Sequence, residues 1–240
     1  MKFLLVTDTH HLGQETEALH RAFWKDVRAK ESFDAILHTG DWGRTELAHV
    51  RESFQVIREE NPDTPIYSVL GNHDLWSSQK SLSLETRLDT ISKYALNNGI
   101  DLIERNPCII GDIAIVGFMG WYGVDQPPTN DHRYLPTYTN QGTANAWLQR
   151  HAFESYKDVG NLNLEGKKVV FLSHFPVVKE IMDRVELSGN AHFGPLVLDI
   201  ADIYCFGHSH QRVDTTVGKT RILNAGAEYD HFPKYIIFDL

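Results

Sequence analysis

The 240-residue sequence has only two cysteines, Cys108 and Cys205, and both lie in short apolar runs. So few cysteines argue against a disulfide framework, and apolar surroundings are typical of reduced thiols in the core of a cytosolic protein. We therefore expect a cytoplasmic protein whose fold depends on a hydrophobic core.

Long hydrophobic runs are also absent. The first apolar run, residues 3–6, ends before Asp8 and is far too short for a membrane span or a secretory signal. Lipidation signals, low-complexity segments and internal repeats are missing as well. We therefore expect no association with a membrane.

Basic residues are too few to balance the acidic ones, and the net charge is −9 with histidine neutral. This acidity argues against a broad basic surface for nucleic acid or for an anionic membrane. A phosphate substrate is still compatible with the charge, because bound divalent cations reverse the electrostatic potential locally.

The remaining composition is ordinary for a soluble globular protein, with 42% hydrophobic and 23% charged residues. A chain of 240 residues buries a substantial core and fits one large domain or two small ones. Because no linker-like segment divides the sequence, we expect a single domain over residues 1–240.

The first hundred residues alternate between strand and helix patterns. Short β-branched or aliphatic runs predict strands, and apolar residues at helical spacing predict helices. The strands are expected at 3–7, 35–37 and 66–70, and the helices at about 15–30, 47–57 and 84–95. This order is typical of a largely parallel sheet, with a ligand site beyond the carboxyl ends of its strands.

The second half has a different texture. Short strands crowd between residues 102 and 118, and further strands are expected at 168–172 and 203–206, after a helix at about 143–156. The tail from Gln211 onward predicts antiparallel strands with a turn at Gly218. Residues 119–141 are rich in Gly, Pro, Trp and Tyr without a clear period, which predicts a long surface loop of the kind used as a lid. We expect two packed sheets with helices outside, in one α/β unit.

Five groups of polar residues follow directly after expected strands. The largest is Gly71–Asp74, where an amide, an imidazole and a carboxylate follow a sharp turn that glycine favours. Residues at i and i+2 around a strand end direct two side chains into the same crevice. The groups are Asp8 with His10, Asp41, Asn72 to Asp74, His174, and His208 with His210.

These groups contain seven candidate metal ligands: Asp8, His10, Asp41, Asn72, His174, His208 and His210. Aspartate and histidine without cysteine suit a borderline divalent ion such as Mn²⁺, Fe²⁺ or Zn²⁺. One catalytic ion usually has about three protein ligands, so this set is too large for one ion. It suits two ions that share a carboxylate. Asp41 is the natural shared ligand because it stands alone in its group.

The ordered motifs D-x-H, G-D, G-N-H-D, S-H and G-H-S-H, from Asp8 to His210, resemble those of the calcineurin-like metallophosphoesterases. The resemblance implies a four-layer sandwich of two mixed sheets flanked by helices. It also implies that Asp41 bridges two ions. By analogy, the first ion is bound by Asp8, His10 and His210, and the second by Asn72, His174 and His208.

The chemistry implied by this resemblance is phosphate ester hydrolysis. Two cations about 4 Å apart cancel the negative charge of the ester and acidify a bridging water, and the resulting hydroxide attacks phosphorus. His73 is not needed as a ligand and is therefore expected to protonate the leaving oxygen or to stabilise the equatorial oxygens. Asp74 is expected to fix the tautomer of His73.

Four further residues are candidates for substrate contact. Arg44 could bind a phosphate oxygen or lie on a helix surface. Trp121 and Tyr122 could stack on the organic part of a substrate or fasten the loop to the core. His192 lies in a loop between two groups of ligands and could contact a substrate or have a solvated or structural role.

The substrate class follows partly from what the motifs lack. Protein Ser/Thr phosphatases of the family carry G-D-x-x-D-R-G, whereas Gly40–Arg44 departs from it. Asp8–Gly13 is similar to the opening of the family's DNA-repair nucleases and cyclic-nucleotide phosphodiesterases. The nucleases usually add a capping domain, for which this chain has no room, and its acidity disfavours nucleic acid. We therefore prefer a small phosphodiester or phosphomonoester.

Two alternatives stay open. One is a nuclease-type phosphodiesterase of the same family, and the other is a catalytically silent scaffold on the same fold. The retromer subunit that resembles these enzymes lacks the histidine of G-N-H, whereas His73 is present here with a complete ligand set. The sequence therefore favours an active enzyme.

Overall fold

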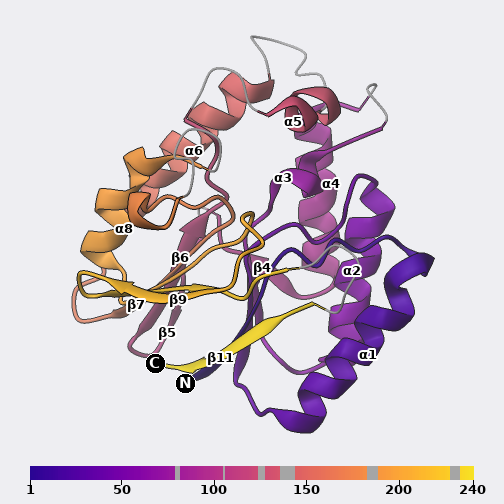
Figure 1. The fold of residues 1–240 in the computed structure, drawn as a ribbon, viewed down its shortest axis with the longest axis horizontal. Coiled ribbons are helices and arrows are strands. Elements are labelled where there is room, and N and C mark those ends of the chain that lie inside the picture. Colours follow the sequence, from indigo (N-terminus) through magenta and orange to yellow (C-terminus); the bar gives the residue numbers. More distant parts are fainter. Residues whose placement is uncertain (79–81, 105, 124–127, 136–143, 183–188, 228–232) are drawn as a thin grey trace.

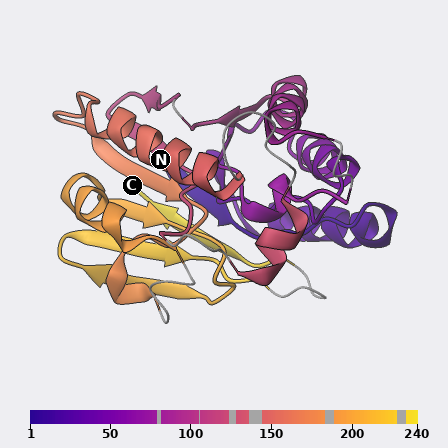
Figure 2. The same ribbon diagram turned by 90° about the horizontal axis from the view of Figure 1, so that it is seen from above.

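The structure is a computed structural model that describes residues 1–78, 82–104, 106–123, 128–135, 144–182, 189–227 and 233–240. Two β-sheets occupy the middle of the molecule, and helices cover both outer faces (Figure 1 and Figure 2). The predicted α/β sandwich of two mixed sheets flanked by helices is therefore confirmed.

The first sheet has the strand order β11-β1-β2-β3-β4. Its first four strands along the chain are parallel, and β11 is antiparallel to β1. The strands are Lys2–Val6 (β1), Ala35–His38 (β2), Ile66–Ser68 (β3), Ile100–Leu102 (β4) and Tyr235–Asp239 (β11). The helices of this half are Gln14–Lys30 (α1), Leu47–Glu60 (α2), Asn72–Leu75 (α3) and Leu84–Asn97 (α4).

The second sheet has the order β5-β6-β7-β8-β10-β9, in which only the pairs at the two edges are antiparallel. Its strands are Cys108–Ile110 (β5), Ile113–Phe118 (β6), Lys168–Ser173 (β7), Ile203–Cys205 (β8), Val213–Val217 (β9) and Thr220–Asn224 (β10). The α-helices of this half are Thr129–Tyr134 (α5), Ala144–Gly160 (α6) and Gly194–Ile200 (α8). Two 3₁₀-helices span Lys179–Ile181 and Ala191–Phe193.

The core has an apolar layer between the sheets and further layers under the helices. Along β1, Phe3 and Leu5 pack with residues of the second sheet such as Val170, whereas Leu4 and Val6 pack with the helices. This follows from the alternation of side chains along a strand. Burial of each such side chain contributes roughly 1.5–3 kcal/mol, so the two sheets are held firmly against each other.

One prediction about the elements is wrong. Residues 119–141 were expected to be an irregular loop, but Thr129–Tyr134 form helix α5. The predicted antiparallel strands of the tail, with a turn at Gly218, are confirmed by the β9–β10 hairpin, and β11 pairs antiparallel with β1 in the other sheet. Residues 124–127 and 136–141 of the expected lid lie outside the described residues.

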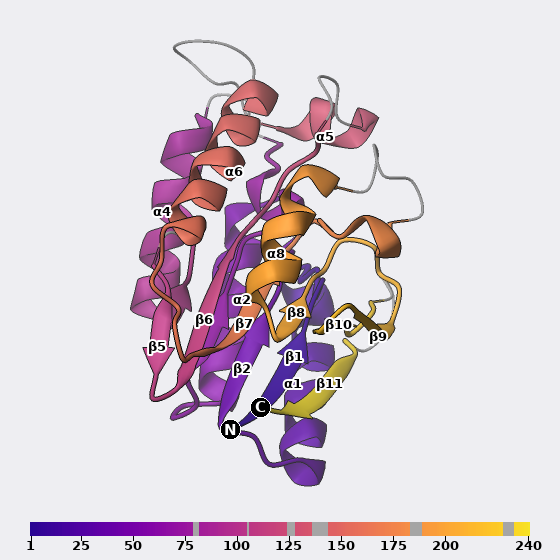
Figure 3. The ribbon, with the colours of Figure 1, turned by 90° about the vertical axis from the view of Figure 1, so that its left-hand side faces the viewer.

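The overall orientation places the termini away from α5. Figure 3 shows both termini near one end of the sheets and α5 at the opposite end, beyond the carboxyl ends of the parallel strands. Among the described residues, every helix is too short or too polar to cross a lipid bilayer.

Helix α1 packs on the loop after β1 through a pair of buried histidines. The Nδ1 atoms of His11 and His20 lie 3.2 Å apart, and neither residue is more than 4% exposed. Burial lowers the pKa of His11 to about 4 and that of His20 to about 3. Both imidazoles are therefore neutral in the folded protein at pH 7.

We expect the His20→Gln variant to be less sensitive to acid than the wild type. A histidine whose pKa is lowered on folding binds more protons when unfolded, so stability falls as the pH drops from about 6.5 toward 4. Removing one such group should reduce the slope of unfolding free energy against pH by about 1.4 kcal/mol per pH unit in this window. Urea unfolding in chelator at pH 7, 6, 5 and 4 measures the slope, and equal slopes for both proteins would contradict the expectation.

Candidate metal centre

Side chains from the carboxyl ends of strands in both sheets meet in one region. Asp8 follows β1, Asp41 follows β2 and His174 follows β7. Backbone hydrogen bonds join neighbouring loops within each sheet, from Asp8 N to Gly40 O (3.0 Å) and from Gly207 N to His174 O (3.0 Å). A bond from His208 N to Asp8 Oδ1 (3.1 Å) joins the loops of the two sheets. The structure brings all seven residues that the sequence marks as candidate ligands into this region.

The first half of the region contains Asp8, His10 and His210. His210 Nε2 lies 3.3 Å from Asp8 Oδ1 and 3.1 Å from His10 Nε2. His10 Nε2 also lies 3.7 Å from Asp41 Oδ2. The donor atoms of these residues therefore face one small volume.

The second half contains Asn72, His174 and His208. Asn72 Oδ1 lies 2.9 Å from His174 Nε2 and 3.2 Å from His208 Nδ1. His174 Nε2 is also 3.5 Å from Asp41 Oδ2, the oxygen that approaches His10 in the first half. Asp41 thus lies between the two halves.

The backbone is unusual at this centre. Within the described parts of the chain, the non-glycine residues with positive φ are Asp8 (49°), His10 (45°), Asp41 (57°), His208 (63°) and His210 (56°). All of them are candidate ligands. Left-handed conformations of non-glycine residues cost about 1–3 kcal/mol each and concentrate at functional sites, so the fold holds these side chains in place at an energetic cost.

Glycines permit the close approach of the two loops that carry Asp41 and Asn72. Gly71 has an ordinary extended backbone with φ of −115°. The sequence suggested that this turn needs glycine for its backbone angles, but the structure shows that it does not. A Cβ at Gly71 would instead overlap the backbone N and the carboxylate of Asp41. Gly40 has a φ of 94°, and a Cβ there would lie 2.8 Å from His174 Nδ1.

Asp74 binds the backbone rather than His73. Its two carboxylate oxygens accept hydrogen bonds of 2.9–3.1 Å from the backbone N–H groups of Gly71 and of residues 41–43. The prediction that Asp74 fixes the tautomer of His73 is therefore wrong, because four backbone donors occupy its oxygens. Asp74 fastens the Asp41 loop to the turn after β3 instead.

His73 lies beside the cluster with its ring stacked on Trp76, at 3.6 Å between ring centroids. Its backbone N–H donates to Asp41 Oδ1 (2.9 Å), and its ring lies 4.6 Å from that of His10. Within the described structure, its Nδ1 atom is buried and has no hydrogen-bond partner. Burial, aided by the neighbouring imidazoles, lowers the pKa of His73, so the ring is neutral at pH 7.

The buried imidazoles of the cluster are neutral as well. Burial lowers the pKa of His10 to about 3 and the pKa values of His174 and His208 to about 4, although the Asp8 carboxylate acts in the opposite direction. A neutral imidazole carries a lone pair on one ring nitrogen, which is the form that binds metal ions. The cluster therefore presents several lone pairs at pH 7.

The two carboxylates of the centre have opposite shifts. Burial raises the pKa of Asp41 well above its usual value, and the nearby carboxylates of Asp8 and Asp74 add to this effect. Burial also acts to raise the pKa of Asp8, but the imidazoles around it, His210 foremost, outweigh burial and lower it. A cation among these groups would relieve the repulsion between their negative charges.

The donor set fits divalent cations. Three groups of donor atoms each lie within 4.8 Å of one another: Asp8, His10 and His210; His10, Asp41 and His73; and Asp8, Asp41 and His174. Carboxylates and neutral imidazoles suit borderline ions such as Mn²⁺, Fe²⁺ and Zn²⁺. His73, which the sequence assigns to catalysis, is thus also within reach of a cation.

A hollow of about 310 Å³ opens beside the second half of the centre. Asn72, His73 and His208 line it from the cluster, and α5 contributes Asn130 and Asp131. A larger hollow of about 610 Å³ lies between α4, β4 and β5, but none of the candidate ligands lines it. The smaller hollow is therefore the better candidate for a substrate pocket.

The comparison with protein families gives one decisive match. The family model described as calcineurin-like phosphoesterase matches residues 1–212. The chain belongs to the calcineurin-like phosphoesterase family. This membership makes it a metal-dependent phosphoester hydrolase, and the cluster at the strand ends is where its donor atoms gather.

Solved structures share the fold of this phosphoesterase. The phosphopantetheinyl hydrolase PptH of Mycobacterium tuberculosis has a TM-score of 0.73 and 16% identity, over 98% of this chain and 95% of that one. A dimetal phosphatase of Danio rerio has a TM-score of 0.53 and 14% identity, over 93% and 86% of the two chains. Identities this low show the fold alone. A search of curated proteins found no match.

The predicted substrate residues of the phosphoesterase lie in different surroundings. Arg44 lines the smaller hollow from the loop before α2, which begins at Leu47, so it is not on a helix surface. Tyr122 lines the same hollow. Trp121 is fully buried, and its Nε1 donates to Asn145 Oδ1 (2.6 Å). The predicted stacking of Trp121 on a substrate is therefore wrong, because the core encloses its ring.

His192 lies on the outer side of the second sheet. Its ring centroid is 6.4 Å from that of Phe153 and 6.2 Å from that of Tyr156, both on α6. It is not among the residues that line the smaller hollow. Its contact with a substrate stays a prediction.

Three contacts that orient ligands were missed by the sequence analysis. His174 Nδ1 lies 2.8 Å from Thr39 O, and Tyr122 OH lies 3.3 Å from His208 Nε2. Asp131 Oδ1 accepts a hydrogen bond from Asn72 Nδ2 (2.9 Å). A backbone carbonyl and an isolated aspartate in a segment without periodicity leave no signal in the sequence.

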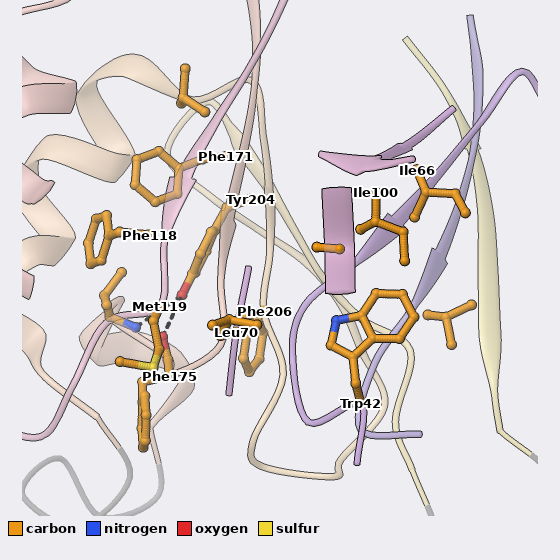
Figure 4. Close-up of a cluster of buried hydrophobic side chains, with 14 of the residues drawn as sticks. Trp42, Ile66, Leu70, Ile100, Phe118, Met119, Phe171, Phe175, Tyr204 and Phe206 are labelled. Carbon is orange, nitrogen blue, oxygen red and sulfur yellow. Dashed lines mark hydrogen bonds between the residues drawn. The ribbon is translucent and has the colours of Figure 1, made fainter. Parts of the chain in front are cut away.

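Packing in the second sheet supports the loop that carries His174. The Tyr204 side chain lies among Phe118, Phe171 and Phe206 and points toward this loop (Figure 4). Its hydroxyl is 2.7 Å from Ser173 Oγ and accepts a hydrogen bond from the backbone N of residue 177 (3.1 Å). One buried hydroxyl therefore contacts both ends of the loop.

We expect the Asp74→Asn variant to be less stable, because the amide nitrogen cannot accept from the two backbone N–H groups that it would face. An unsatisfied buried donor costs roughly 1–3 kcal/mol, so the unfolding free energy should fall by about 2–6 kcal/mol. Urea unfolding of metal-free protein measures the change.

Asp26→Asn is a matched control, because Asp26 forms an exposed pair with Lys30. Its unfolding free energy should change by less than ~0.5 kcal/mol. If Asp74→Asn unfolds at the urea concentration of this control, the role of Asp74 as a backbone anchor is wrong.

Proposed function

We propose that the chain hydrolyses a small phosphodiester or phosphomonoester with two divalent cations. The supporting observation is the position of Asp41 Oδ2 within 3.7 Å of His10 Nε2 and 3.5 Å of His174 Nε2, between the two halves of the cluster. Asp41 would contribute to both cation sites. The first cation would be held by Asp8, His10 and His210, and the second by Asn72, His174 and His208.

The bound cations would supply charge neutralisation for the phosphate and would acidify water for attack on phosphorus. The residues around them would orient the ester and donate a proton or a hydrogen bond to the leaving oxygen. Borderline ligands favour manganese, iron or zinc. Two buried carboxylates and several neutral imidazoles provide no positive charge for a phosphate. A phosphate ester could therefore bind beside them only with cations present.

His73 is the proposed donor to the leaving group. When the P–O ester bond breaks, the leaving oxygen gains negative charge and needs a proton or a hydrogen bond. The His73 ring lines the hollow beside the cluster and has an unpartnered Nδ1 among the described residues. The pKa of His73 is lowered in the protein without substrate. The ring therefore either donates a hydrogen bond as a neutral group, or gains a proton when the nearby ester anion raises its pKa and then acts as an acid.

The size and charge of the hollow support a small ester. Its volume of about 310 Å³ lies at the low end of small-molecule sites. Arg44 adds one cationic side chain, whereas the whole chain has a net charge of −9. The names of similar structures, a phosphopantetheinyl hydrolase and a dimetal phosphatase, are compatible with such substrates.

We also propose that residues 1–240 act as one domain, since β11 at the end of the chain pairs with β1 at its start. A cytoplasmic location is proposed from the two cysteines. Both cysteines are free thiols, which suits a reducing compartment.

We expect metal-stripped protein to be inactive and Mn²⁺ to restore hydrolysis of an aryl phosphodiester. The reason is that no side chain of the cluster can replace the positive charge that the ester requires. Turnover of bis(p-nitrophenyl) phosphate before and after dialysis against chelator measures the effect, and bound metal is counted by atomic emission.

Asp41→Ala should lose both bound metal and turnover. Asp214→Ala is a matched control, because Asp214 lies on β9 and forms an exposed pair with Arg221. It should keep both. Full activity in metal-stripped protein, or no activity with any added divalent ion, would overturn the proposed function.

We expect His73→Ala to keep its metal and to lose turnover chiefly for esters with poor leaving groups. Alkyl esters should lose ~10²–10⁴-fold, because proton donation contributes most when the leaving oxygen is basic. The measurement is kcat across a series of esters whose leaving groups differ in pKa.

Equal losses for good and poor leaving groups would rule out proton donation and leave charge stabilisation. Because His73 is within reach of a cation, the metal content of the variant must be measured in the same samples. Loss of one ion in His73→Ala would make His73 a ligand instead.

A further inference from the structure

The carboxylate of Asp131 is a buried junction between α5 and the metal centre. Asp131 is 3% exposed and lies in α5, far along the chain from the candidate ligands. Its Oδ1 accepts from Asn72 Nδ2 (2.9 Å) and Trp76 Nε1 (2.7 Å), and its Oδ2 accepts from Tyr122 OH (2.9 Å). Three side-chain donors thus converge on one carboxylate.

This carboxylate determines which way the Asn72 amide faces. An ionised carboxylate only accepts hydrogen bonds, so the amide must turn its NH₂ group toward Asp131. Its carbonyl oxygen then faces the opposite way, toward His174 Nε2 (2.9 Å) and His208 Nδ1 (3.2 Å). The oxygen needed for a metal ligand is thereby directed into the cluster.

Asp131 also acts on His208, through Tyr122. The single hydroxyl proton of Tyr122 is donated to Asp131, so toward any other group the phenolic oxygen is an acceptor. The contact with His208 Nε2, 3.3 Å away, is therefore a hydrogen bond when the ring carries its proton on Nε2. A neutral imidazole that carries its proton on Nε2 has its lone pair on Nδ1, the atom that faces Asn72 Oδ1.

We propose that Asp131 and Tyr122 are positioning residues, which orient Asn72 and His208 as ligands of the second cation. The inference rests on the proposed function, because it requires that a second cation binds. It assigns to the segment around α5 a role in building the metal centre, in addition to forming a wall of the hollow. Partners of this kind typically change metal affinity by 10–100-fold.

The inference distinguishes the two cation sites. Asp8, His10 and His210 have no hydrogen bond to Asp131 or Tyr122 among those described. Loss of the Tyr122 hydroxyl should therefore weaken the second site and spare the first. A merely structural role for the hydroxyl would change stability but not the relative affinity of the sites.

The test compares Tyr122→Phe with wild type and with Tyr134→Phe. Tyr134 is a matched control, because it lies on α5 and packs on Trp76, at 5.2 Å between ring centroids. Metal-free protein is titrated with Mn²⁺ by calorimetry, and bound ions are counted after equilibrium dialysis. Wild type and Tyr134→Phe should bind two ions, and Tyr122→Phe should bind the second about 10–100-fold more weakly.

A spectroscopic measurement on metal-free protein tests the orientation directly. Long-range ¹H–¹⁵N correlation spectra should show His208 of the wild type with its proton on Nε2, and a mixture of tautomers in Tyr122→Phe. Asp131→Asn provides a second variant if Tyr122→Phe does not fold. It should show the same selective loss of the second ion, because one oxygen of the junction becomes a donor.

Two ions bound by Tyr122→Phe and Asp131→Asn with wild-type affinities would overturn this inference and leave the proposed function intact. Equal weakening of both sites would also overturn it. Failure of the wild type to bind a second ion would overturn the proposed function and this inference together.

Discussion

The structure depends on the burial of many electron-pair donors at the edge where the two sheets meet. Carboxylates repel one another when they are enclosed together without a cation, and burial disfavours every charged form of the groups around them. Burial raises the pKa of Asp41, with the nearby carboxylates adding to the effect, and burial lowers the pKa values of His10 and His174. Divalent cations would convert the repulsion into attraction, so the arrangement that is costly without metal becomes favourable with it.

The rest of the fold holds this arrangement in place. Each proposed cation site combines ligands from both sheets, since Asp8 and Asn72 follow strands of the first sheet whereas His210 and His174 follow strands of the second. The apolar layer between the sheets therefore sets the distance between ligands. Closer to the site, Asp74 joins the loops of the first sheet through four backbone hydrogen bonds.

Regular patterns made much of the fold predictable. The stripe of buried residues on α1 and the apolar runs of β1 to β3 are long or regular enough to stand out from their neighbours. Helix α5, with six residues in a segment without a clear period, was not predictable. The pairing of β11 with β1 was also missed, because no local feature of the tail tells which sheet it joins.

The sequence by itself determined the residue types of the metal centre and their placement after strands, since periodicity is local and parallel strands end at a common edge. Only the tertiary structure decided which groups meet. Asp131 reaches Asn72 across 59 positions and Tyr122 reaches His208 across 86, while Asp74 turns to the backbone and Trp121 to the core. Such contacts depend on how distant elements pack, and a hydrogen bond between remote side chains leaves no periodic trace in the chain.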